Sequence, residues 1–174
     1  MLFRSMLAPL GTPDAIIRKV NADLKIVLAD PEVSTKLAAN GGRAVMTFFA
    51  EIDAFVAENG GDATLKPFVD ALADTKAKLQ EATFWLMQNG MQNPDNAGAA
   101  SNDYLHLFGL TCTAYMWCLM VKAAAPKAGD DSFYAEKIAT GRFFLDRILP
   151  DAAAHLVKLK TGAESLMALS AEAF

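Results

Sequence analysis

Hydrophobic residues recur at intervals of three and four along most of the chain, and this spacing is typical of amphipathic helices. No stretch alternates apolar and polar residues over the length of a strand between turn signals. The pattern therefore predicts an all-α protein with helices separated by proline, glycine and asparagine.

The first forty residues predict a small helical hairpin. Pro13 stands at a typical helix start, and apolar residues over 16–28 form one narrow stripe. Pro31 should separate this helix from a shorter one over 32–39, because the residue before a proline is pushed out of the helical region. The Asn-Gly-Gly sequence at 40–42 is expected to end the second helix.

Four longer helices are predicted after this hairpin, joined by short polar connections. Their approximate ranges are 43–58, 62–89, 97–125 and 132–161, the last interrupted at Pro150. Short connections favour antiparallel neighbours, so we expect an antiparallel four-helix bundle. A last short helix is predicted over 163–170.

The helix over 97–125 is predicted to be central. Residues 105–121 are apolar on nearly every side, as expected of a helix packed all round. The longest uncharged run, 107–121, is shorter than the about 20 residues that a membrane span needs, so no span is expected.

Composition narrows the function classes. The chain has 174 residues, of which 53% are hydrophobic and 21% charged, so it is not a disordered tail. A net charge of −4 offers no basic field for nucleic acid or an anionic membrane surface.

Cys112 and Cys118 should point away from each other on one helix, so we expect two unpaired core residues and a cytoplasmic location.

Candidate catalytic groups are few. We expect His106 to be a partly buried, hydrogen-bonded residue and His155 to be exposed, with neither in a metal site. Glu51 and Asp53 fall on a solvated helix face, and no sequence typical of a serine nucleophile occurs. No catalytic or metal-binding residue is therefore predicted.

Aromatic and sulfur-containing side chains are the most prominent candidate cluster. Such a group either forms bundle core and interface or lines a site for a flat cofactor or an acyl chain. The first alternative is favoured. The candidate residues are Phe84, Trp85, Met87, Tyr104, His106, Phe108, Tyr115 and Trp117.

Several short segments occur in a specific order: ATFWLMQNG at 82–90, NPDNAGA at 93–99, YLHLFGL at 104–110, FYAEK at 133–137 and GAESLMAL at 162–169. In this order, residues 41–174 resemble the C-terminal region of acyl-CoA dehydrogenases. The resemblance is to the subgroup that includes 3-methylmercaptopropionyl-CoA dehydrogenases.

The resemblance implies a helical domain of a flavoenzyme. In that family, FAD takes hydride from the β-carbon of an acyl-CoA thioester while a glutamate removes the α-proton. That glutamate lies in a tyrosine-glutamate-glycine-threonine motif that this sequence does not contain. The implied role is a non-catalytic domain without its own cofactor, packed on the catalytic domain or on a second copy. The alternative is a stand-alone helical interaction or dimerisation module.

A second resemblance concerns the hairpin segment. Residues 6–40 are similar to the late region of tripartite tricarboxylate-type solute-binding proteins, on sequences such as GTPDAII at 11–17 and LADPEV at 28–33. This predicts two parts of different origin, residues 1–40 and residues 41–174, joined near Asn40 as a chimera.

Overall fold

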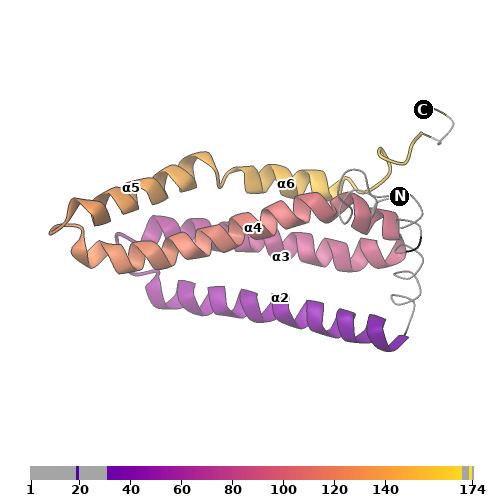
Figure 1. The fold of residues 1–174 in the computed structure, drawn as a ribbon, viewed down its shortest axis with the longest axis horizontal. Coiled ribbons are helices and arrows are strands. Elements are labelled where there is room, and N and C mark those ends of the chain that lie inside the picture. Colours follow the sequence, from indigo (N-terminus) through magenta and orange to yellow (C-terminus); the bar gives the residue numbers. More distant parts are fainter. Residues whose placement is uncertain (1–18, 20–30, 170–172, 174) are drawn as a thin grey trace. The chain divides into compact units, whose positions relative to one another are not determined.

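The computed structural model describes residue 19, residues 31–169 and residue 173, and every regular element in that part of the chain is a helix (Figure 1). The predicted helix before Pro31, and with it the predicted hairpin, lies outside the described residues. The elements are α2 (Pro31–Asn59), α3 (Lys66–Gln92), α4 (Pro94–Ala124), the 3₁₀ helix η1 (Ala125–Lys127), α5 (Ser132–Arg147) and α6 (Asp151–Lys160).

The predicted break at 40–42 is wrong, because α2 runs without interruption through Asn40 and both glycines. Each glycine in a helix costs only about 1 kcal/mol relative to alanine, and helical turns on both sides offset that cost. The chain divides into two compact units, residues 1–48 and residues 49–174, so the last third of α2 belongs to the second unit.

The second unit is built around α3 and α4. A single residue, Asn93, joins them, and its side chain caps α4 by accepting a hydrogen bond from the Asp95 backbone N–H at 3.0 Å. Because the connection is so short, the two helices run antiparallel and pack along their length. Their largest fully buried side chains are Phe68, Val69, Leu72, Thr75, Leu79, Leu107, Thr111, Cys118 and Val121.

The last part of α2 packs on this pair. The Tyr115 hydroxyl of α4 donates a hydrogen bond to Glu51 Oε1 at 2.9 Å, and its ring meets Phe55 edge-on at 5.4 Å between centroids. On the α3 side, Lys76 Nζ lies 2.9 Å from Asp53 Oδ2. The helix ends at Asn59, one residue beyond the predicted end at 58, and two glycines follow it.

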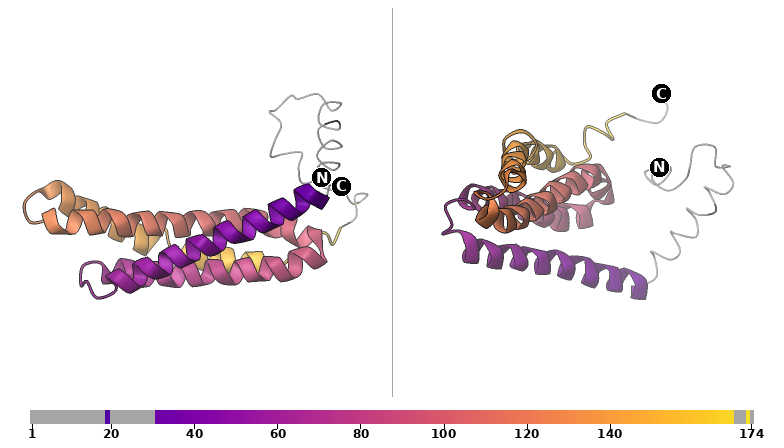
Figure 2. Two further views of the ribbon diagram at one scale, coloured as in Figure 1. Left: turned by 90° about the horizontal axis from the view of Figure 1, so that it is seen from below. Right: turned by 60° about the vertical axis from the view of Figure 1, so that its left-hand side comes forward.

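Helices α5 and α6 follow one another along another side of the α3–α4 pair (Figure 2). The predicted interruption at Pro150 is confirmed, since α5 ends at Arg147 and α6 begins at Asp151. Gly141 permits a close approach here, because a Cβ atom on it would lie 2.9 Å from Phe68 Cε1 and 3.0 Å from Trp117 Cε3. The all-α, four-helix bundle is confirmed, with α5 and α6 together forming its fourth member.

The predicted short helix after residue 162 is wrong. Residues 163–169 form turns, with one helical-type hydrogen bond from the Met167 N–H to the Ala163 carbonyl oxygen at 2.9 Å. Leu166 and Leu169 are 68% and 63% exposed, so this segment gains little apolar burial to offset the cost of helix nucleation.

One helical stretch, Pro94–Lys127, is long and apolar enough to cross a membrane by length and composition alone; it is the only such stretch among the described residues. The central helix of a packed bundle meets the same criteria. Its inner side contacts α3, α5 and α6, which explains part of its apolar character.

Candidate functional site

The eight candidate residues do not gather at one place. Tyr115 is buried, while Trp85, Tyr104, Phe108 and Trp117 are half-buried. The remaining three, Phe84, Met87 and His106, are exposed. The cluster therefore separates into core contacts and outward-facing side chains, with no common cavity for a flat cofactor.

Two of the aromatic residues join elements of the bundle. Burial raises the pKa of the Tyr115 hydroxyl, and its hydrogen bond to the Glu51 carboxylate raises that pKa further. Trp117 lies 6.2 Å from Phe144 of α5 between ring centroids. Tyr115 therefore keeps its proton, and Trp117 packs against α5. Both side chains contribute to the packing of the bundle.

Tyr104 ties α4 to α3 near the other end of the pair. Its hydroxyl lies 2.9 Å from Thr83 Oγ1, and its ring lies 6.1 Å from that of Phe108. Burial raises the pKa of this hydroxyl, although the hydrogen bond to Thr83 acts in the opposite direction. Tyr104 is thus a neutral hydrogen-bonding group in a helix contact.

An outward-facing apolar stripe lies on α3. Phe84, Met87 and Met91 are 44%, 50% and 86% exposed. At about 100° per residue, their spacing of three and four places them within a sector of about 60° on one side of the helix. We call these three residues the α3 stripe. Clustered exposed hydrophobic residues of this kind mark interaction surfaces.

A longer stripe lies on α4, within a sector of about 80°. Leu105, Met116 and Met120 are 66%, 47% and 38% exposed, Gly109 is exposed and Cys112 is half-buried. We call these five residues the α4 stripe. The expectation that this helix is packed all round is therefore wrong, because α3, α5 and α6 cover only its other side.

The two histidines depart from expectation. His155 is not exposed: its Nδ1 atom lies 2.8 Å from Asp103 Oδ1, with side chains only 18% and 17% exposed. His106 is exposed and stacks on His155, with ring centroids 5.0 Å apart and planes 6° from parallel. Spacing within one helix could not predict this contact, because His155 lies on α6 whereas Asp103 and His106 lie on α4. No group of three potential metal-binding side chains occurs in the described part of the chain.

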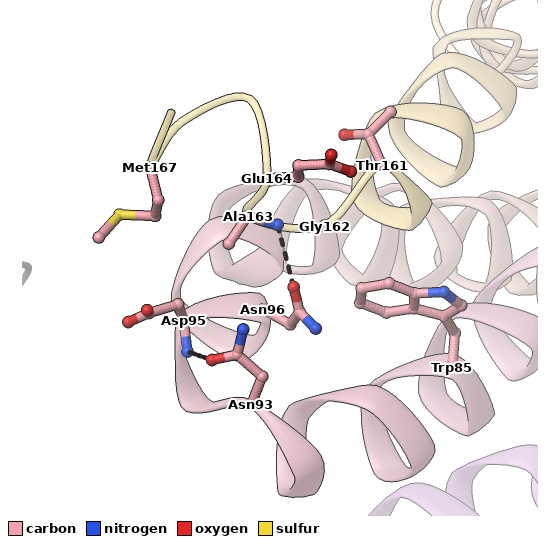
Figure 3. Close-up of a pocket in the computed structure, with 9 residues that line it drawn as sticks. All are labelled: Trp85, Asn93, Asp95, Asn96, Thr161, Gly162, Ala163, Glu164 and Met167. Carbon is pink, nitrogen blue, oxygen red and sulfur yellow. Dashed lines mark hydrogen bonds between the residues drawn. The ribbon is translucent and has the colours of Figure 1, made fainter. Parts of the chain in front are cut away.

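A cavity of about 440 Å³ lies where the α3–α4 connection meets the segment after α6 (Figure 3). This corner is held by Asn96, whose Oδ1 accepts a hydrogen bond from the Ala163 N–H at 3.0 Å. Gly162 has φ +68°, and a Cβ atom on it would lie 2.9 Å from the same oxygen, so the turn requires glycine. The lining residues are Trp85, Asn93, Asp95, Asn96, Thr161, Gly162, Ala163, Glu164 and Met167.

The charges at this cavity do not suit a nucleotide cofactor. Its lining carries Asp95 and Glu164 but no lysine, arginine or histidine. The diphosphate of FAD and the phosphates of coenzyme A are anionic and would be repelled by these carboxylates. The residues present here do not fit the flavin of the resembling family.

Two further cavities contain a lysine that is already paired. In one, of about 460 Å³, Lys160 forms an ion pair with Glu81. In the other, of about 300 Å³, Lys78 pairs with Asp74. A neighbouring carboxylate offsets the charge of each lysine, so neither cavity offers an unpaired cation to a phosphate group. We assign no redox step to these residues.

The two cysteines are unpaired and lie in different surroundings. Cys118 is fully buried, as predicted, and burial raises its pKa to about 12, so it is a neutral thiol at physiological pH. Cys112 is only half-buried, in the α4 stripe, so it is not the core residue that the sequence predicts; burial raises its pKa as well. Neither thiol has the lowered pKa of an activated nucleophile.

Comparison with known proteins identifies relatives of this bundle. A family model described as "Acetyl-CoA dehydrogenase C-terminal like" matches residues 48–170. A 3-methylmercaptopropionyl-CoA dehydrogenase of Ruegeria pomeroyi is 27% identical over 161 residues. That alignment covers 90% of this chain and 27% of the relative, so the chain spans about a quarter of the relative's length.

Proposed function

This chain belongs to the acetyl-CoA dehydrogenase C-terminal-like family, and from that membership we propose that it is a non-catalytic helical docking domain of an FAD-dependent acyl-CoA dehydrogenase. The proposed parent reaction is α,β-dehydrogenation of an acyl-CoA thioester. The relative's name supports a thioester substrate of this class.

The observation that carries this proposal is the α3 stripe. Phe84, Met87 and Met91 follow one another on a single side of α3 with large exposed fractions. Covering such apolar surface contributes about 25 cal/mol per Å², so a partner surface is favoured over water. We assign this stripe to the contact with the catalytic domain.

The cavities bear on which domain holds the cofactor and the substrate. The side chains of these three cavities offer no unpaired cation for a flavin or coenzyme A phosphate, which supports assigning the cofactor and substrate contacts to the catalytic domain. The unpaired thiols of Cys112 and Cys118 support a cytoplasmic location for the assembly.

A domain exchange tests this function. In the Ruegeria pomeroyi relative, the region that this chain matches is replaced by the chain, beside a control enzyme that lacks the region altogether. We expect the exchanged enzyme to be soluble, to retain flavin and to oxidise 3-methylmercaptopropionyl-CoA, whereas the truncated enzyme should lose flavin or precipitate.

A charged substitution sharpens the exchange. Met87→Lys should lower flavin retention in the exchanged enzyme at least about tenfold, because a lysine must be desolvated in an apolar contact. Met116→Lys introduces the same change on α4 at nearly equal exposure, 47% against 50%, and should leave flavin retention unchanged. An exchanged enzyme that behaves like the truncated one would contradict the proposal.

The second candidate function is a stand-alone helical dimerisation module. The α4 stripe favours it, because a second copy of the chain would cover this exposed, uncharged surface without a catalytic domain. Under this candidate the chain binds itself tightly, and the Met87→Lys change has no effect on any assembly.

The origin of the residues before Gly41 is a separate question. An alignment over 90% of the chain necessarily includes part of that segment, which supports a single origin and weighs against a chimera joined at Asn40. A single-molecule read of the source DNA across the Asn40–Gly41 codons distinguishes the two. A read that continues upstream of Gly41 into other acyl-CoA dehydrogenase sequence would support the chimera, whereas a read that reproduces this frame in one gene would contradict it.

A further inference from the structure

The cavity between the α3–α4 connection and the segment after α6 combines an aromatic ring with two carboxylates. Trp85 is half-buried, whereas Asp95 and Glu164 are exposed. The turn at Gly162 brings its segment close to the indole, because a Cβ atom there would lie 3.8 Å from Trp85 Cη2 (Figure 3). The cavity's volume of about 440 Å³ lies in the range of about 300–1,000 Å³ that is typical of small-molecule sites.

The carboxylates in this cavity have no ion-pair partner among the described residues. The ion pairs there use other acidic side chains. Residues 79–121, which supply the α3 and α4 part of the lining, contain no lysine or arginine. The lysines in the last turn of α6 do not line the cavity, and Lys160 pairs with Glu81. Asp95 and Glu164 therefore give the cavity a negative charge that no side chain of its lining offsets.

Two helix ends add to this negative potential. Helix α3 ends next to Asn93 and α6 ends next to Thr161, and both residues line the cavity. The C-terminal end of a helix carries roughly half a negative elementary charge, which favours cations. The N-terminal end of α4 has the opposite sign, but only this one end opposes the two C-terminal ends. The potential in the cavity therefore favours a positively charged ligand.

Trp85 narrows the class of ligand to an organic cation. Cations are attracted to the face of an indole, and a planar guanidinium group also stacks on it. No group of three potential metal-binding side chains occurs in the described ranges, so a bare divalent metal ion lacks the ligands that it needs. A guanidinium group also presents several N–H donors, which suit the carboxylates of Asp95 and Glu164.

We propose that this cavity binds a guanidinium group, with Trp85 as the stacking surface and with Asp95 and Glu164 supplying the opposite charge. The proposal does not depend on the docking function, because no residue of the α3 stripe lines the cavity. The guanidinium group belongs either to a free compound or to an arginine side chain of a protein, and the probes below distinguish these two sources.

The first test follows the indole N–H signals of the full, ¹⁵N-labelled chain by NMR during titration at low ionic strength. The chain has two tryptophans, so a Trp117→Phe variant identifies the signal of Trp85. We expect Nα-acetylarginine methylamide to shift this signal in a saturable way. The citrulline analogue has the same shape without the charge and should bind at least about tenfold more weakly. Equal affinities, or no saturable shift with either probe, would overturn the proposal.

The second test removes the two carboxylate charges. Asp95→Asn combined with Glu164→Gln should weaken binding of the arginine probe about 3- to 10-fold, as expected for the loss of two exposed ionic contacts. The control combines Asp130→Asn with Glu136→Gln, which removes the same charges at exposed positions outside the cavity. This control should bind like the parent chain. Circular dichroism checks that both variants keep their helices, and equal affinity of the two variants would overturn the proposal.

Two further probes identify the source of the group and the kind of cation. Butylguanidine represents a free guanidinium compound. If it binds as tightly as the arginine probe, the site is assigned to free guanidinium compounds, whereas weaker binding assigns it to an arginine side chain of a protein. Nα-acetyllysine methylamide tests the alternative cation, and tighter binding of this probe than of the arginine probe would overturn the assignment of a guanidinium group.

Discussion

The two sides of α4 are made of similar residues in different surroundings. Leu107 is fully buried against the rest of the bundle, whereas Leu105, two residues earlier, is 66% exposed. Cys118 is fully buried, whereas Cys112 is only half-buried on the outer side. Residue type therefore does not distinguish the two sides. The exposed apolar residues of the outer side are typical of an interaction surface.

The same contrast occurs on α3 and gives the largest expected effect. Phe68 is 1% exposed and Phe84 is 44% exposed. Phe68→Ala should lower the free energy of unfolding by about 3–5 kcal/mol, since it removes a core ring and leaves a cavity. Phe84→Ala should cost less than about 1 kcal/mol in the isolated chain. Urea denaturation measures both, and equal costs would contradict the assignment of inner and outer sides.

Gly141 tests how closely α5 packs on the inner side. Its missing side chain leaves room for the rings of Phe68 and Trp117, which a Cβ atom would approach to about 3 Å. Gly141→Ala should destabilise the bundle by about 1–3 kcal/mol despite alanine's higher helix propensity. A gain in stability by thermal denaturation would mean that α5 packs less closely.

The Asp103–His155 contact tests whether α6 is held by a specific hydrogen bond. A double-mutant cycle with Asp103→Ala and His155→Ala should give a coupling energy of about 1 kcal/mol at neutral pH, because both side chains are largely shielded from water. The Glu81–Lys160 pair is the control. Its side chains are 52% and 44% exposed, and its coupling should be below about 0.5 kcal/mol.

Gly109 should give the smallest effect and the opposite sign to Gly141. A methyl group there meets nothing in the same chain, so Gly109→Ala should stabilise the monomer by up to about 1 kcal/mol through helix propensity. The measurement requires dilution to the point where the chain is monomeric. A loss of stability under these conditions would show that the position is not an open gap.

Local signals predicted most of the fold. The helix predicted to end at 58 ends at Asn59, and the predicted interruption at Pro150 separates α5 from α6, because these residues act on their own backbone. The glycines at 41 and 42 do not end α2, because they lower helix propensity without forbidding the helical conformation. Propensity alone does not decide whether the flanking turns compensate.

The candidate site was less predictable because exposure is a property of neighbours. Tyr115 and Met116 are adjacent in sequence, yet one is buried and the other is 47% exposed. The contact of His155 with Asp103 joins residues 52 positions apart, and no spacing rule within one helix reveals it. Helical spacing identifies a stripe, but the packing of other helices decides whether the stripe is covered.

Flavin retention of the exchanged enzyme, with and without Met87→Lys, tests most directly the central claim that the α3 stripe contacts the catalytic domain. The account predicts that the exchanged enzyme retains flavin and that Met87→Lys lowers this retention at least about tenfold, because a lysine must be desolvated in an apolar contact. Flavin retention that Met87→Lys leaves unchanged would contradict the claim that this side of α3 is an interface.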